Sequence, residues 1–261
     1  MKLNKKLVGL MGILAVGALV LGACGSSKEA DTKESTTATS STTAEATTLK
    51  VTDGEGNEVE VPSKPTKVVV FDMGSLDTIN QLGAGDSVIA TATDNLPKYL
   101  ADFSSVESAG GIKEPDLEKI NALQPDLIII SGRQQDAKAD LEKIAPTLYL
   151  GVDSTKTWES TKQNIETLGT IFGKEDLATE KIADLETTIT EVKTAAEESG
   201  TKGLTVLVNE GSLSAYGSGS RFGIIHDTFG VAQADENIEV STHGQEVSYE
   251  YVLEKNPDVL L

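Results

Sequence analysis

Cysteine, arginine and histidine are scarce in this sequence of 261 residues. It contains one cysteine, Cys24, two histidines, His226 and His243, and two arginines, Arg133 and Arg221. A single cysteine excludes an internal disulfide and a cysteine-rich zinc or iron–sulfur site. Two histidines cannot supply the three or four protein ligands that a zinc or manganese carrier uses. We therefore expect neither a resident metal nor a cofactor.

The sequence also lacks the patterns of a nucleophilic enzyme. It has no Gly-x-Ser-x-Gly motif, and no thiol outside the N-terminal segment. The glycines of residues 217–223, GSGSRFG, match neither the dinucleotide-binding fingerprint nor a phosphate-binding loop. We therefore expect a binding protein and not an enzyme.

The N-terminus reads as an export signal. Residues 1–23 begin with three lysines and continue with an apolar run that ends in Leu-Gly-Ala before Cys24. This stretch resembles a lipobox, in which the cysteine becomes the lipid-carrying first residue of the mature protein. The alternative, a transmembrane anchor, would need a longer apolar run. Residues 24–48 are rich in Ser and Thr and nearly free of apolar side chains, which is typical of a flexible tether.

Positive charge is in short supply. The net charge is −19, and removing the three lysines of residues 1–23 leaves −22. No basic stripe interrupts this acidic composition, so we expect no binding to nucleic acid. Of the 22 basic residues, only two are arginine, so this chain uses lysine wherever a solvated positive charge suffices.

The order of apolar runs predicts an α/β fold. Residues 50–62 alternate as in a β-hairpin, and strand and helix patterns then follow in turn. Near-continuous apolar strands that alternate with helices favour a parallel sheet covered on both faces. We expect strands at 67–72, 87–93, 125–131, 147–152 and 204–210, and helices at 75–83, 115–123, 139–145, over about 40 residues after Trp158, and at 221–229.

A repeat links the two halves of the chain. Residues 115–130 and 247–261 align at an offset of 132, so that Glu118 falls on Glu250 and Asp126 on Asp258. We interpret this as two lobes of like topology, although a chance match of a short helix–strand unit is the alternative. The chain stops inside the last predicted strand, so we expect the C-terminal lobe to be incomplete.

These patterns divide the chain into five parts. They are a lipoprotein signal peptide (1–23), a Ser/Thr-rich flexible tether (24–48), an N-terminal α/β lobe (49–156), a connecting helical segment (157–199) and a C-terminal α/β lobe (200–261).

Both arginines lie where an anion could bind. Arg133 follows a predicted parallel strand, at the edge of the sheet where ligands usually bind. Arg221 follows four Gly and Ser residues at a predicted helix start, where free N–H groups also favour anions. The alternative for each is a surface arginine paired with a carboxylate. We expect His226 to be a packed or surface helix residue, whereas His243, in a polar loop, could face either a ligand or the core.

Several of these stretches resemble one family. KPTKVVVFDMGSLDTINQLG, PDLEKINALQPDLIIISGRQ, GSRFGIIHD, DENI and THGQ are similar to the periplasmic binding proteins of iron–siderophore ABC importers. Within that family, they most resemble the branch that binds ferric catecholate siderophores such as petrobactin. The resemblance covers residues 49–261.

The resemblance implies a fold and a set of site residues. The fold is two Rossmann-like lobes joined by a long helix, with the ligand in the cleft between the lobes. Arg133 and Arg221 would be two of three arginines around the anionic chelate, the third being expected beyond Leu261. His243 resembles a histidine that binds iron in some members. Glu118 and Glu250 would dock the permease, the alternative being solvated helix charges.

We therefore expect a lipid-anchored, extracytoplasmic, monomeric subunit of an ABC importer. It would capture a ferric siderophore and deliver it to a membrane permease that works with a cytoplasmic ATPase. The alternatives are a carrier of another iron chelate (a hydroxamate siderophore or haem) or of cobalamin, a surface hydrolase, and an adhesive lipoprotein.

Overall fold

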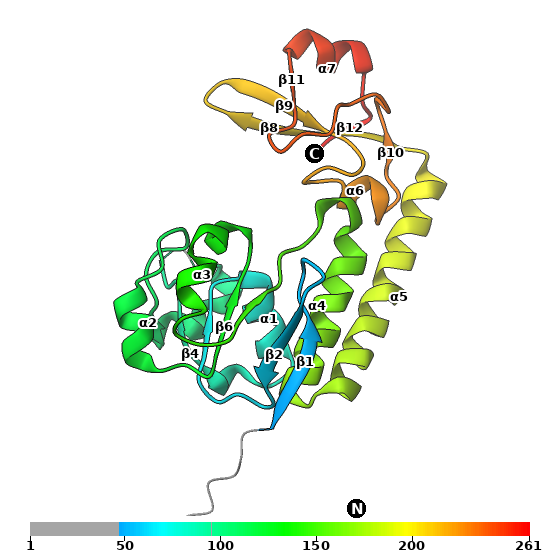
Figure 1. Cartoon of the computed structure of the whole chain (residues 1–261). Coiled ribbons are helices and arrows are strands. Elements are labelled where there is room, and N and C mark those ends of the chain that lie inside the picture. The colour runs from blue at the N-terminus through cyan, green and yellow to red at the C-terminus, as the bar shows by residue number, and fades with distance from the viewer. Residues whose placement is uncertain (1–46, 95) are drawn as a thin grey trace, which may run out of the picture. The chain divides into compact units, whose positions relative to one another are not determined.

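The computed structural model describes residues 47–94 and 96–261 (Figure 1). The predicted signal peptide, Cys24 and nearly all of the predicted tether lie outside the described residues. The last residue of that predicted tether, Thr48, begins the first strand. No helix among the described residues is both long enough and apolar enough to cross a membrane.

The first two strands form the predicted hairpin. β1 (Thr48–Thr52) and β2 (Glu58–Pro62) pair antiparallel, with Thr52 opposite Glu58. Val51 and Val61 are buried, so one face of the hairpin joins the core of the first lobe.

The central sheet of the first lobe is parallel throughout, as the apolar runs predict. Its strand order is β5-β4-β3-β6-β7. The strands are β3 (Val68–Val70), β4 (Val88–Thr91), β5 (Glu107–Ser108), β6 (Leu127–Ile130) and β7 (Thr147–Tyr149).

Both faces of this sheet are covered by core side chains. Along β6, Leu127 and Ile129 belong to one buried cluster, and Ile128 and Ile130 belong to the other. The first cluster includes α1 (Met73–Gln81), α4 (Thr157–Phe172) and the start of α5 (Glu175–Ser199), and the second includes α2 (Leu117–Leu123) and α3 (Lys138–Leu141). Short 3-10 helices are η1 (Gly85–Ser87), η2 (Lys98–Ser105), η3 (Gly132–Ala137) and η4 (Ser154–Lys156).

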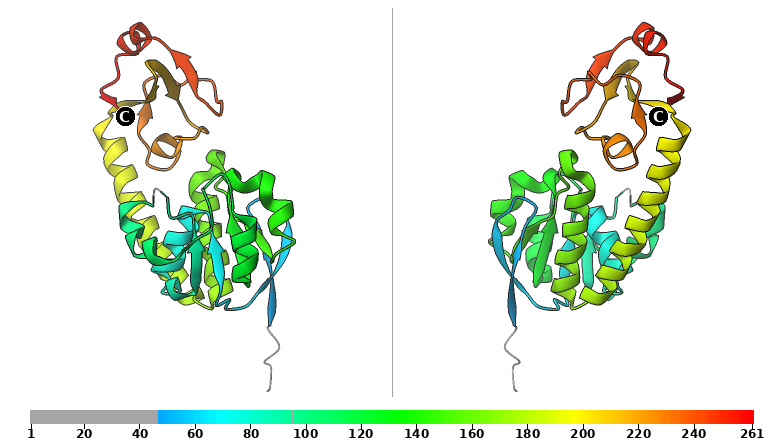
Figure 2. Two further views of the ribbon diagram at one scale, coloured as in Figure 1. Left: turned by 90° about the vertical axis from the view of Figure 1, so that its left-hand side faces the viewer. Right: turned by 90° about the vertical axis from the view of Figure 1, so that its right-hand side faces the viewer.

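The long helical segment consists of two helices. α4 ends at Gly173, whose φ of 64° is left-handed, and α5 begins two residues later. The two helices then run side by side, as both views in Figure 2 show. A Cβ on Gly169 would come within 2.7 Å of the Ala178 Cβ, so the absence of a side chain there permits this close approach.

The second sheet is mixed, which differs from the parallel arrangement expected from the repeat. β8 (Lys202–Asn209) and β9 (Ser212–Tyr216) form an antiparallel hairpin, and β11 (Gln245–Val247) pairs antiparallel with β9. Only β10 (Ala232–Gln233) and β12 (Val259–Leu260) are parallel to β8. The cause is the two-residue turn Glu210–Gly211, in which both residues have positive φ, as in the turns that close hairpins.

Two predicted helices are shorter than expected. The helix predicted at 221–229 is confined to α6 (Ile224–Asp227), and α3 replaces the helix predicted at 139–145. Arg221 therefore lies in a turn before a helix that is only four residues long.

The repeat is structural. α7 (Tyr249–Lys255) and α2 have the same length and lie 132 residues apart, and each ends at a left-handed residue, Asn256 or Gln124. β6 and β12 then pair with equivalent positions, Val68 and Gly203. In each helix–strand unit of the repeat, an aspartate, Asp126 or Asp258, binds the backbone at the start of the neighbouring strand. Asp126 accepts hydrogen bonds from the N–H groups of Thr66 and Lys67, and Asp258 accepts one from Lys202.

Asp126→Ala should lower the free energy of unfolding by about 1–3 kcal/mol, because two backbone N–H groups lose a charged acceptor. Asp258→Ala should cost about half as much, because one N–H group is affected. The control is Asp140→Ala, whose carboxylate pairs with the exposed Lys143. Urea unfolding followed by circular dichroism measures all three. An Asp126 variant as stable as the control would show that these hydrogen bonds contribute nothing.

Candidate ligand-binding site

Arg133 lies on a rigid turn at the carboxyl edge of the parallel sheet. It is the second residue of η3, which begins two residues after β6 ends. The next residue, Gln134, is buried, and its side chain is held at both ends. Its Oε1 accepts a hydrogen bond from the Ser131 N–H at 3.0 Å, and its Nε2 donates to the carbonyl of Ile112. The backbone of the turn is thereby fixed while the Arg133 side chain stays exposed.

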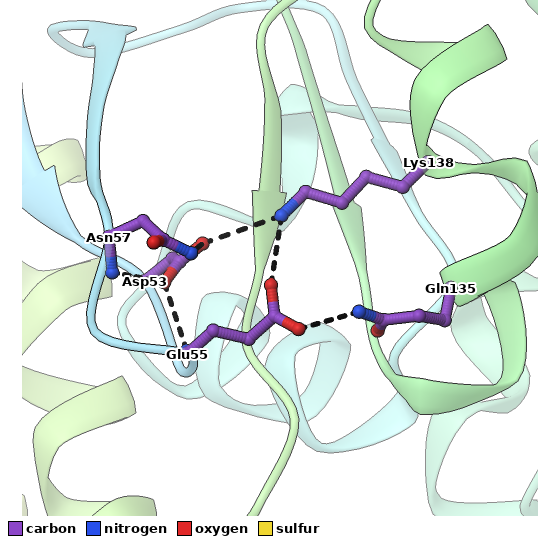
Figure 3. A network of polar contacts seen from close by, with 5 residues as sticks. All are labelled: Asp53, Glu55, Asn57, Gln135 and Lys138. Atoms are coloured by element: carbon purple, nitrogen blue, oxygen red, sulfur yellow. Dashed lines mark hydrogen bonds and ion pairs between the residues drawn. The ribbon is translucent and has the colours of Figure 1, made fainter.

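A polar network joins the same turn to the β1–β2 hairpin (Figure 3). The Lys138 ammonium lies 3.1 Å from Glu55 Oε2 and 3.6 Å from Asp53 Oδ2. Gln135 Nε2 donates to the other Glu55 oxygen at 2.6 Å. Asp53 also accepts hydrogen bonds from the N–H groups of Glu55 and Asn57. The hairpin tip is therefore tied to the segment that carries Arg133.

All three charged groups of this network are ionised near neutral pH. Burial raises the pKa of Asp53, but hydrogen bonds from Asn57 and Glu55 and the charge of Lys138 outweigh it, so the net pKa lies below its ordinary value. Hydrogen bonds from Lys138 and Gln135 lower the pKa of Glu55. Burial lowers the pKa of Lys138, but its contacts with Glu55 and Asp53 raise it by more, so the net pKa lies above its ordinary value.

Arg221 is placed by aromatic packing. Its guanidinium carbon lies 5.1 Å from the centre of the Phe222 ring, within the range of a cation–π contact. The Phe222 ring packs edge-to-face on Tyr216, with ring centres 4.8 Å apart and an angle of 80°. Tyr216 is fully buried, so the Phe222 ring beside Arg221 is held in place by the core.

The sequence predicts free backbone N–H groups in the Gly and Ser residues before Arg221, but two of these groups already donate hydrogen bonds. The N–H group of Gly219 donates to Asp227 Oδ2 at 2.7 Å, and that of Ser218 donates to Gln233 Oε1 at 3.0 Å. The expectation of open N–H groups is therefore wrong for Ser218 and Gly219, because side chains of the same lobe occupy them. The loop serves instead to hold the backbone of Arg221.

His243 is connected to Arg221 through the same tyrosine. Its side chain is exposed in the loop before β11, and the next residue is Gly244. A Cβ on Gly244 would lie 2.7 Å from Tyr216 Cζ and 2.9 Å from the Ala215 carbonyl oxygen. Gly244 also has a φ of 75°, which favours glycine. Tyr216 therefore contacts both neighbours, Phe222 beside Arg221 and Gly244 beside His243.

Neither arginine is neutralised within residues 47–94 and 96–261. The ion pairs there are all formed by lysine, from Lys119–Asp116 to Lys255–Asp235. The alternative of a surface arginine paired with a carboxylate is thus not what the structure has. Both guanidinium groups keep their charge and their fork of donors for another partner.

His226 has the packed role that the sequence favours. It is buried in α6, and its Nδ1 lies 2.8 Å from the Val231 carbonyl oxygen. Within the part of the chain that the structure describes, no group of three or more His, Cys, Asp or Glu side chains could hold a metal.

Glu118 and Glu250 occupy matching exposed positions in the first turns of α2 and α7. Hydrogen bonds from its own N–H group and from Ser248 lower the pKa of Glu250. α7 is held by Asp235, which pairs with Lys255 at 3.0 Å and accepts a hydrogen bond from the Tyr251 hydroxyl. Hydrogen bonds, foremost from the Asn237 N–H, lower the pKa of Asp235 to about 2.

Two grooves beside the long helices do not include the candidate residues. One groove of about 450 Å³ lies between α1, α4 and α5, and another of about 380 Å³ is lined by α4, α5 and α6. Their linings are mainly apolar, and the first contains two aspartates and one lysine. Neither lining suits an anionic ligand, so Arg133 and Arg221 remain the candidate residues for one.

The chain belongs to the periplasmic binding protein family, which it matches over residues 68–261. The petrobactin-binding protein YclQ of Bacillus subtilis is 51% identical over 206 residues, which cover 78% of this chain and 65% of YclQ. This chain thus spans slightly less than two thirds of that relative's length.

Solved structures agree with the α/β fold of two lobes that the sequence predicts. The crystal structure of YclQ gives a TM-score of 0.80 at 48% identity, covering 82% of this chain and 76% of that chain. The periplasmic catecholate-siderophore binding protein VctP of Vibrio cholerae gives 0.76 at 32% identity, covering 82% and 77%.

Gly244→Ala should lower the free energy of unfolding by about 2–4 kcal/mol, because the methyl group meets Tyr216 and the φ angle is strained. The matched control is Gly211→Ala. Gly211 has a φ of 87°, but a Cβ there would meet nothing within 4 Å. The control should therefore lose only the backbone part, about 1 kcal/mol. Equal losses in urea unfolding would show that contact with Tyr216 does not constrain the loop of His243.

Proposed function

We propose that this member of the periplasmic binding protein family is the ligand-capturing subunit of an ABC importer for ferric siderophores. Its ligand would be an anionic complex of the catecholate, petrobactin-like type. The protein would bind the complex and hand it to the membrane permease without chemical change. Iron is then cargo held by its chelator, and the protein itself needs no cofactor.

The observation that carries this proposal is the pair of arginines, neither of which forms an ion pair with the residues that the structure describes. A protein of net charge −19 repels anions over most of its surface, so an anion can bind only where local positive charge dominates. A guanidinium is planar and weakly hydrated, and it can donate two parallel hydrogen bonds to a delocalised oxygen anion. One such contact at ~4 Å is worth roughly 4 kcal/mol of gross attraction before desolvation, at an effective dielectric constant near 20.

The two arginines come from different lobes. We propose that Arg133 and Arg221 contact one ligand, bound in a cleft between an N-terminal lobe (49–156) and a C-terminal lobe (200–261) connected by residues 157–199. His243 would complete the iron coordination where the siderophore leaves positions open, since imidazole is a common ligand of iron. Tyr216 packs against their chain neighbours Phe222 and Gly244, which supports a joint role for Arg221 and His243.

The location follows from the N-terminal sequence. We propose that the chain is exported, that Cys24 carries the lipid, and that residues 24–48 tether the binding lobes to the outer face of the cell membrane. Glu118 and Glu250 would then meet basic residues of the permease, one from each lobe, and the protein would act as a monomer.

Arg133→Lys and Arg221→Lys should each weaken the binding of a ferric tris-catecholate about tenfold, although the charge is kept, because an ammonium cannot form the paired hydrogen bonds. Quenching of intrinsic protein fluorescence on titration measures the affinity. Lys143→Arg, at an exposed position, is the control and should bind like the parent. Parental affinity in both lysine variants would contradict the proposed role of the guanidinium groups.

The double variant Glu118→Ala/Glu250→Ala should abolish uptake of the ferric siderophore in cells while leaving its affinity unchanged, because docking and capture use different surfaces. Glu180→Ala/Glu191→Ala removes two exposed charges from α5 and is the matched control. If the first double variant takes up the siderophore as well as the control does, Glu118 and Glu250 have no docking role and are only solvated helix charges.

A further inference from the structure

The polar network beside Arg133 carries an excess of negative charge. Two carboxylates, Asp53 and Glu55, share one ammonium, Lys138. The Asp53 side chain is fully buried, and the Lys138 side chain is 20% exposed, so solvent screens them less than it screens surface groups. With all three ionised, the network has a charge of −1.

This charge lies close to Arg133. Lys138 follows η3 directly, five residues after Arg133, and a 3-10 helix rises about 2 Å per residue. The separation along the helix is therefore about 10 Å, which is comparable to the distance over which salt screens charges at physiological ionic strength. The net negative charge of the network would therefore repel an anion bound at Arg133.

The network also engages a carboxylate from the hairpin that reaches the segment of Arg133. Glu55 is the hairpin carboxylate that reaches the turn, and both of its oxygens are occupied, one by Gln135 at 2.6 Å and the other by Lys138 at 3.1 Å. Figure 3 shows both side chains meeting Glu55 from the segment that carries Arg133. Both Glu55 oxygens are thus engaged by Gln135 and Lys138.

Other acidic side chains near the carboxyl edge of the sheet are either stabilised by hydrogen bonds or exposed to solvent. Asp72, at the end of the neighbouring strand β3, accepts hydrogen bonds from the N–H group and the hydroxyl of Ser75 at the start of α1. The N-terminus of a helix stabilises such a charge. Glu142 is exposed beyond α3. Asp136, three residues after Arg133 within η3, is exposed like Glu142, so solvent screens both charges. The partly buried charge in this segment is therefore the one that Lys138 offsets.

We propose that Lys138 is a specificity-determining residue, which offsets the hairpin carboxylates Asp53 and Glu55 and so keeps the surroundings of Arg133 favourable for an anionic ligand. The inference rests on the proposed function. It assigns the β1–β2 hairpin a part in ligand selection, through charge and without contact with the ligand.

The test is a charge-compensation cycle in the full chain, with a ferric tris-catecholate as the probe. Lys138→Gln makes the network −2 and should weaken binding about three- to tenfold in about 20 mM salt. Glu55→Gln makes it neutral and should tighten binding by a similar factor. The double variant restores −1 and should bind within about twofold of the parent. In about 0.5 M salt, these differences should shrink to less than about twofold.

Two controls separate charge from structure. Lys143→Gln changes the total charge equally at an exposed pair and should alter affinity less than Lys138→Gln. Thermal unfolding of each variant shows whether its fold is intact. If the network acts only by holding the structure together, the double variant should bind the probe most weakly, and Glu55→Gln should bind it more weakly than the parent. Either of those results would overturn the inference.

Failure of the inference differs visibly from failure of the proposed function. A parent protein that binds no ferric catecholate would overturn the proposed function and this inference together. A parent that binds and depends on Arg133, with no compensation between Lys138→Gln and Glu55→Gln, would overturn this inference alone.

Discussion

Two arginine side chains that form no ion pair within the described residues impose the main constraint on this strongly acidic protein. Each guanidinium would gain from a carboxylate partner, and carboxylates are abundant, with 41 Asp and Glu in the chain. Two acids that contact the segments of these arginines are engaged by other groups. Lys138 and Gln135 occupy Glu55, and the backbone of Gly219 occupies Asp227. These two carboxylates are thus occupied by groups other than the arginines, which agrees with the proposal that Arg133 and Arg221 bind an anionic ligand.

The same side chains are held by rigid supports. The parallel sheet brings Arg133 to its carboxyl edge, and the buried Gln134 fixes the turn. In the second lobe, the buried Tyr216 contacts both Phe222 and Gly244, the neighbours of Arg221 and His243. Because little backbone rearrangement is then needed on binding, less affinity is lost to ordering the site.

Much of this architecture could be predicted from the sequence, since its signals are local. Apolar runs predict the parallel sheet, and the repeat correctly predicts that α2 and β6 recur as α7 and β12. The antiparallel hairpin of β8 and β9 was not predicted, because Glu210–Gly211 is a weaker turn signal than Asn-Gly. Tyr216, Phe222 and Gly244 were missed as supports of the site, since their contacts join positions up to 28 residues apart. Composition singled out Arg133 and Arg221 as candidates, because arginine is so rare here.

The most direct test of the central claim compares two iron complexes of similar size and different charge. Fluorescence titration of the parent protein with a trianionic ferric tris-catecholate and with a neutral ferric tris-hydroxamate gives both affinities under one set of conditions. Recognition of an anion by Arg133 and Arg221 predicts that the catecholate complex binds at least about a hundredfold more tightly, which corresponds to about 2.7 kcal/mol. Equal affinity for the two complexes would contradict it.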